Sequence, residues 1–190
     1  ILFPIEGRVK LKEIFMILYH VSENLNNYID VFYPRIPSED RMCLGENISI
    51  KRVCVSSNIA GAFSAMPRED DIANKKFRVY EFELDEKDKD LLDYKTIYNR
   101  NYVQDSLCTK EHWILKNIKP SRHYDIIVKS YDNELIPVLR KDLWKTYFNT
   151  YADDQDAFLE KNGGFLMSAF KKVFYIKDNV EFISENDIYE

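Results

Sequence analysis

Apolar and polar residues alternate over two parts of the chain, and a third part is a short apolar run. Residues 77–84 read Phe-Arg-Val-Tyr-Glu-Phe-Glu-Leu, an alternation that predicts a strand with one face in water. Residues 51–56 also alternate, so Val53 and Val55 are expected on one face of a second strand and the polar side chains on the other. The apolar run at 16–22 ends in Tyr-His-Val-Ser and predicts a buried strand.

The remaining segments predict short strands and short helices. Further strands are expected around 113–115 and over 124–130, 173–176 and 180–183. Helices are expected over 59–66, where Ser57 or Asn58 can cap the first turn, and over 139–148, 154–161 and 165–171. Strands interrupted by short helices, without regular βαβ spacing, predict an α+β domain rather than a doubly wound sheet.

The length and composition suit one domain. The chain has 190 residues, of which 45% are hydrophobic and 31% charged, enough for both a core and a solvated surface. Residues 5–8, Ile-Glu-Gly-Arg, spell a common engineered protease site, and Met16 precedes the first strand. We interpret residues 1–15 as an engineered leader or a native extension and leave them out of functional reasoning. Residues 16–190 are expected to form a single α+β domain, with helical and strand elaboration after about residue 130.

Charge and cysteine content narrow the class of protein. The net charge is −5, so the chain lacks the basic footprint of a general nucleic-acid-binding protein. The three cysteines form no CxxC pair and no zinc spacing with a histidine, which predicts no metal site and favours a reducing, cytoplasmic compartment. No apolar run approaches 20 residues, so no membrane span is expected.

His20 lies near the end of the apolar run at 16–22, where an imidazole needs a polar partner. One interpretation is a core histidine satisfied by a backbone carbonyl. The other is a histidine held at the rim of a pocket, where it offers a donor to a ligand hydroxyl. In that case the neighbouring Tyr19 and Ser22 would add polar contacts.

The irregular segment 23–47 is predicted to be a long loop, and long loops in compact domains often carry function. Within it, Tyr-Pro-Arg-Ile-Pro at 33–37 places Arg35 on a backbone stiffened by two prolines. Such a guanidinium suits a phosphate group, although an exposed loop charge fits equally well. Glu46 and Arg52 flank the second strand and could pair with each other.

Polar residues also stand at the ends of two later segments. One of Ser56 and Ser57 is expected to cap the helix that follows, and the other to face the same pocket as His20. No Gly-x-Ser-x-Gly elbow surrounds them, which disfavours a serine hydrolase. Glu111 precedes Trp-Ile-Leu at 113–115 and is expected at the start of a strand. It is either a surface glutamate or a carboxylate that binds a ribose hydroxyl and stabilises positive charge on a sugar.

Taken in order, three segments resemble the ADP-ribosyltransferase superfamily. They are Leu-Tyr-His-Val-Ser at 18–22, Arg-Val-Cys-Val-Ser-Ser at 52–57 and Thr-Lys-Glu-His-Trp at 109–113. The first is also similar to the opening motif of the diphtheria-toxin-like and RNA 2′-phosphotransferase-like branches. The resemblance covers about residues 16–130 and implies a split β-sandwich with short flanking helices.

The resemblance also implies an activity: transfer of ADP-ribose from NAD to a macromolecular target, or hydrolysis of NAD. His20 would hold a ribose of NAD, Ser56 or Ser57 would support the pocket floor, and Arg35 would hold the pyrophosphate. Glu111 would contact the nicotinamide-ribose 2′-hydroxyl and favour an oxocarbenium-like state. The acceptor would be a protein rather than a nucleic acid.

The chain departs from the family pattern in two ways. Thr109 stands where arginine-specific members carry Gln or Glu, which argues against arginine as the acceptor. No tyrosine follows the second segment in an obvious nicotinamide-stacking place, and the candidates are Tyr80, Tyr94 and Tyr98.

Two other functions remain open from the residues. A small, acidic, tyrosine-rich chain with aromatic residues spaced three and four apart over 144–151 fits a non-enzymatic bacterial or phage interaction or inhibitor protein. Transfer of an RNA or nucleotide phosphate would use a related fold, but the acidic balance and the lack of clustered arginines count against it.

Overall fold

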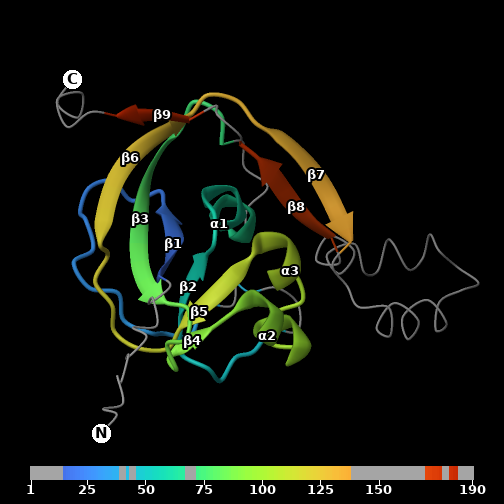
Figure 1. Cartoon of the computed structure of the whole chain (residues 1–190). Helices are drawn as coiled ribbons and strands as arrows, with labels where there is room; N and C mark the ends of the chain where they lie inside the picture. The colour runs from blue at the N-terminus through green and yellow to red at the C-terminus, as the bar shows by residue number, and fades with distance from the viewer. Residues whose placement is uncertain are drawn as a thin grey trace, which may run out of the picture.

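A seven-stranded antiparallel sheet forms the body of the protein in the computed structural model, which describes residues 15–38, 42, 46–66, 72–137, 170–176 and 180–183 (Figure 1). Its strands run in the order β4-β5-β2-β1-β3-β6-β9. Their bounds are β1 Phe15–Ser22, β2 Val53–Ser56, β3 Lys76–Asp85, β4 Leu91–Leu92, β5 Glu111–Ile114, β6 Arg122–Val128 and β9 Val180–Ile183. With its few short helices, this mostly antiparallel arrangement is an α+β fold.

Three short helices and a two-stranded sheet complete the described part of the chain. The helices are α1 Ile59–Ala65, α2 Tyr94–Asn99 and α3 Ser106–Thr109, and the second sheet pairs β7 Asp132–Pro137 with β8 Phe170–Tyr175. Helix α1 lies between the main sheet and β8 (Figure 1), where the Phe174 N–H donates to the Ser64 hydroxyl at 3.0 Å. None of the described helices combines the length and apolar character needed to cross a bilayer.

Most predicted elements in the described residues are confirmed. The strands expected over 16–22, 51–56, 77–84, 124–130, 173–176 and 180–183 are β1, β2, β3, β6, β8 and β9, and the strand expected around 113–115 is β5. The helix expected over 59–66 is α1. The helix expected over 165–171 is wrong at its end, because residues 170 and 171 belong to β8. The helices expected over 139–148 and 154–161 lie outside the described residues.

Strand β3 corrects the expectation that residues 77–84 have one face in water. Phe77 and Val79 are fully buried on the side of α1, and Tyr80 and Phe82 are fully buried on the opposite side. The opposite side is covered because the loop after β1 packs Phe32 against the Tyr80 and Phe82 rings. Two hydrophobic clusters therefore hold the sheet, one on each face.

A buried ion pair ties β3 to β6 and gives the first prediction. Arg78 and Asp125 are cross-strand partners, and the guanidinium donates to both carboxylate oxygens at 2.6 and 2.8 Å. Because removing one member leaves the other charge buried and unpaired, Asp125→Asn should lower the free energy of unfolding by about 3 kcal/mol in urea denaturation. The matched control is Glu181→Gln, which removes the exposed partner of Lys129 and should cost at most about 1 kcal/mol. Equal losses for the two variants would contradict this reading of the pair.

Candidate functional site

The main sheet splits between its two central strands, β1 and β2. β1 pairs with β3 along its whole length, and β2 pairs with β5 along its whole length. Between β1 and β2, however, pairing is confined to one position, Tyr19 opposite Ser56. The two strands therefore separate beyond that position, and the sheet behaves as two halves joined at a single point.

Three different kinds of group contact the main chain of β2 along the edge that faces the split. Ser56 pairs with β1, the Cys54 carbonyl lies 3.0 Å from Nδ1 of the His20 ring, and Arg52 exchanges two main-chain hydrogen bonds of 3.0 Å with Arg35. His20 thus occupies the place where a continuing β1 backbone would have bonded to β2. Because the pairing of β1 with β2 is confined to Tyr19, β1 offers no main-chain partner to the Cys54 N–H.

A cleft of about 1120 Å³ opens at this split. The residues along it come from β1, the loop after β1, β2, α1 and the start of β5. Of the seven residues that the sequence suggested for a binding or catalytic site, five line it: Tyr19, His20, Ser22, Arg35 and Glu111. Pockets that hold small molecules commonly reach about 1,000 Å³.

His20 combines the two interpretations that its position left open. Its ring contacts a backbone carbonyl, as a core histidine does, and it packs edge-on against Phe32 with ring centroids 5.2 Å apart. It also lines the cleft. The backbone contact therefore fixes the ring at the cleft wall.

The loop after β1 is pinned at two points, which holds its residues over the cleft. Phe32 exchanges main-chain hydrogen bonds with Ile118, and Arg35 does so with Arg52. Between these anchors Tyr33 points outward, 64% exposed, and lines the cleft together with Arg35. An exposed ring and a guanidinium two residues apart on a fixed backbone suit a flat base and a phosphate. Sequence reasoning missed Tyr33, although the prolines beside it signalled the rigidity.

Ser56 and Ser57 do not take the places expected of them. Asn58 caps α1, accepting from the Gly61 N–H at 2.7 Å, so neither serine is the cap. The Ser56 side chain is fully buried and donates to the Thr109 carbonyl at 2.7 Å. Neither serine is among the residues that line the cleft. Ser56 instead fastens β2 to the turn before β5.

Glu111 opens β5, as expected, but it is no surface residue. The residue is 6% exposed, and its carboxylate accepts from the Trp113 indole N–H at 2.7 Å. Burial, with the charges of Asp105 and Glu46, raises the pKa of Glu111 to about 7, against the lowering effect of hydrogen bonds from Trp113 and Cys54. A carboxyl group that changes charge near neutral pH can act either as an acid or as a charge stabiliser.

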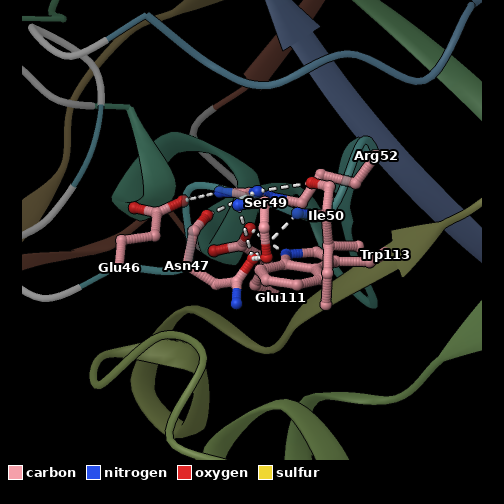
Figure 2. Close-up of polar contacts among 7 residues, drawn as sticks. All are labelled: Glu46, Asn47, Ser49, Ile50, Arg52, Glu111 and Trp113. Atoms are coloured by element: carbon pink, nitrogen blue, oxygen red, sulfur yellow. Dashed lines mark hydrogen bonds and ion pairs between the residues drawn. The ribbon is translucent and has the colours of Figure 1, made fainter.

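A buried polar cluster holds Glu111 in place (Figure 2). The Arg52 guanidinium lies over the Trp113 ring, 4.1 Å from its centroid, and forms an ion pair with Glu46. It also donates to the carbonyls of Asn47 and Ile50 at 2.9 and 2.8 Å. The pairing of Glu46 with Arg52 that the sequence suggested is confirmed. Because so many contacts meet at Arg52, the cluster is rigid around the Trp113–Glu111 hydrogen bond.

Strand register places His20 and Glu111 on opposite faces of the sheet. Tyr19 lies opposite Ser56, and Ser56 lies opposite Glu111, so these three side chains share one face. His20 follows Tyr19 and points to the other face. The cleft is lined from both faces, so a ligand that touches both His20 and Glu111 must lie in the split between β1 and β2.

The tyrosines considered for stacking lie elsewhere. Tyr80 is fully buried between Phe32 and His123, and its hydroxyl accepts from the Ile29 N–H at 3.0 Å. Tyr94 packs against His112. Neither they nor Tyr98 line the cleft.

The fold and the site define a class: an α+β protein whose antiparallel sheet splits at its centre and holds a polar cleft with a buried glutamate. Comparisons with protein families, with curated proteins and with solved structures found no match. Within the described residues, no cluster of three or more His, Cys, Asp or Glu side chains has the arrangement of a metal site.

Proposed function

We propose that the protein binds NAD in the cleft and breaks its nicotinamide–ribose bond, as an ADP-ribosyltransferase-like protein or a NAD glycohydrolase. The observation that carries the proposal is the split between β1 and β2, which opens one cleft lined by both His20 and Glu111. The ordered motifs at 18–22, 52–57 and 109–113 support it, because they contribute the two strands and the glutamate of this cleft.

The proposed step transfers the ADP-ribosyl group from nicotinamide to a nucleophile. The bond between ribose C1′ and the nicotinamide nitrogen breaks, and its electron pair leaves with nicotinamide. Glu111 in its ionised form binds the ribose 2′-hydroxyl and stabilises the positive charge that develops on the sugar. A nucleophile from a protein target, or water, attacks C1′ and gives up its proton to solvent. His20 holds a ribose hydroxyl at the opposite wall.

The two ends of the cleft carry different charged residues, which suit different parts of NAD. Glu46, Asp105 and Glu111 gather near β5 and suit the positively charged nicotinamide ribose. Arg35 stands exposed on the pinned loop beside Tyr33 and suits the pyrophosphate and a base.

Arg35 provides the test of binding. NAD should raise the thermal midpoint of the wild-type protein, because a ligand at a hundred times its Kd adds about 2.7 kcal/mol to stability. Arg35→Ala should weaken NAD binding at least about tenfold, since a hydrogen bond to a charged group contributes about 1.5–3 kcal/mol. Arg100→Ala removes the same charge from an exposed position outside the cleft and should leave the affinity unchanged. No thermal shift with NAD for the wild-type protein would overturn the proposal.

A second candidate function is nucleotide binding without turnover, as in an interaction or inhibitor protein. The observation in its favour is that one carboxylate oxygen of Glu111 already accepts the Trp113 N–H, which leaves fewer lone pairs for a ribose. NAD binding without nicotinamide release would favour it. The aromatic residues over 144–151 that suggested a protein-binding stripe lie outside the described residues.

A further inference from the structure

A lysine from the C-terminal part of the chain reaches the acidic end of the cleft. Lys171, in β8, lies 3.1 Å from a carboxylate oxygen of Asp105, the residue before α3. Their side chains are 12% and 2% exposed, so the pair is buried. β8 is held against α1 through the hydrogen bond from the Phe174 N–H to Ser64 and through the burial of Phe174. The lysine is therefore placed by packing rather than by chance on a free surface.

Asp105 belongs to the surroundings of Glu111. Both line the cleft, and after burial the charge of Asp105 contributes most to the raised pKa of Glu111. The loop before β2 adds Glu46 and its partner Arg52, and β2 adds Cys54, whose pKa is raised by burial and by Glu111. Helix α1 reads Ile-Ala-Gly-Ala-Phe-Ser-Ala and adds no ionisable side chain.

We infer that Lys171 is a positioning residue of the cleft, which holds the Asp105 carboxylate in place and offsets its charge beside Glu111. The inference deepens the proposed function and rests on it for the meaning of the charge on Glu111. It makes the returning strand β8 part of the site. It also makes the site sensitive to pH, because only ionised Glu111 can stabilise a positive sugar.

The direction of each substitution follows from the charges. Without Lys171 the negative charge of Asp105 acts more strongly on Glu111, so the Glu111 carboxyl should hold its proton to higher pH. Without the Asp105 charge the carboxyl should lose its proton at lower pH. In the double variant the Asp105 charge that Lys171 offsets is absent, so Lys171→Met should add little to the effect of Asp105→Asn.

Trp113 provides a readout that needs no activity. Its indole N–H bonds directly to Glu111, so its fluorescence should change when the carboxyl gains or loses a proton. The chain has two tryptophans, and Trp144→Phe leaves Trp113 as the single emitter. A pH titration of this variant should show a midpoint near 7, and Glu111→Gln in the same background should abolish that transition. Any transition that persists in the Gln variant belongs to another group, such as His112.

Three substitutions in the Trp144→Phe background then decide the inference. Lys171→Met should raise the midpoint by at least half a pH unit, and Asp105→Asn should lower it by a similar amount. Lys171→Arg keeps the positive charge and should leave the midpoint where it was. Should Lys171→Met fail to fold, Lys171→Gln removes the same charge with a polar side chain and repeats the test. An unchanged midpoint in Asp105→Asn, or an unchanged or lowered midpoint in Lys171→Met, would overturn the inference.

Nicotinamide release separates this inference from the proposed function. If the protein is a NAD-cleaving enzyme, the rate should rise as the pH passes through the fluorescence midpoint, and the two midpoints should shift together in the variants. Fluorescence shifts without nicotinamide release would support the coupling and sink the proposed function. Release whose pH profile stays fixed in all three variants would overturn the coupling and leave the proposed function standing.

Discussion

Glu111→Gln should lower the rate of nicotinamide release by about two to three orders of magnitude, the loss typical when one group that stabilises developing charge is removed. The affinity for NAD should stay within about tenfold, because the carboxylate is proposed to act mainly on the transition state. Glutamine keeps the shape of the side chain and one oxygen that can accept the Trp113 N–H. The measurement is nicotinamide release at saturating NAD, with the Kd obtained by calorimetry.

The matched control is Glu83→Gln, which makes the same chemical change at an exposed position of β3 away from the cleft. It should release nicotinamide at the wild-type rate.

The stability of the protein supplies a second check on Glu111. The pKa of Glu111 is raised from 4.5 to about 7 in the folded protein, so ionising this group opposes folding. Its cost is absent below about pH 4.5 and complete above about 7, so Glu111→Gln should gain stability relative to wild type across that window. Full activity in Glu111→Gln would mean that another group stabilises the sugar.

The strands could be predicted from the sequence because their patterns are local. The alternation over 77–84 and the apolar run at 16–22 are visible in neighbouring residues, and both are strands. The wet face expected on β3 was wrong because its cover comes from Phe32, 45 or more residues earlier in the chain. No local pattern carries that information. Helix α2 was missed for a similar reason: it is six residues long, and its main signal is the Asp93 cap.

The residues of the candidate site could be anticipated in part. His20, Arg35 and Glu111 were predicted as site residues from their residue types and their places in the sequence. All three line one cleft. Ser56 carried the same kind of signal but is fully buried under α1, because its face is decided by the pairing with Tyr19 and Glu111. Lys171 could not be anticipated, since it reaches Asp105 only through the packing of β8 on α1.

Gly61→Ala should lower the free energy of unfolding by about 3 kcal/mol, at the upper end of the cost of overpacking a core. A methyl group at this position would lie 2.2 Å from the Thr109 carbonyl oxygen and 2.3 Å from the Ser56 hydroxyl oxygen. The first of these atoms is main chain and cannot rotate away. Helix propensity alone predicts the opposite sign, a gain of about 1 kcal/mol when Gly in a helix becomes Ala. A thermal midpoint roughly 6–12 °C below wild type would show that the close approach outweighs propensity.

Ser56→Ala separates the two contacts. It removes the hydroxyl but leaves the Thr109 carbonyl, so Gly61→Ala should cost less in the Ser56→Ala background than in wild type, without becoming neutral. The site should respond as well, because Thr109 lies two residues before Glu111 in the turn that sets its position. If α1 is pushed from β2 and this turn, the Trp113–Glu111 hydrogen bond should weaken, and Trp113 fluorescence should report it at temperatures where the protein is still folded. A stabilised Gly61→Ala protein with unchanged fluorescence would show that α1 has room to move, and that the glycine is not needed to seat the helix beside Glu111.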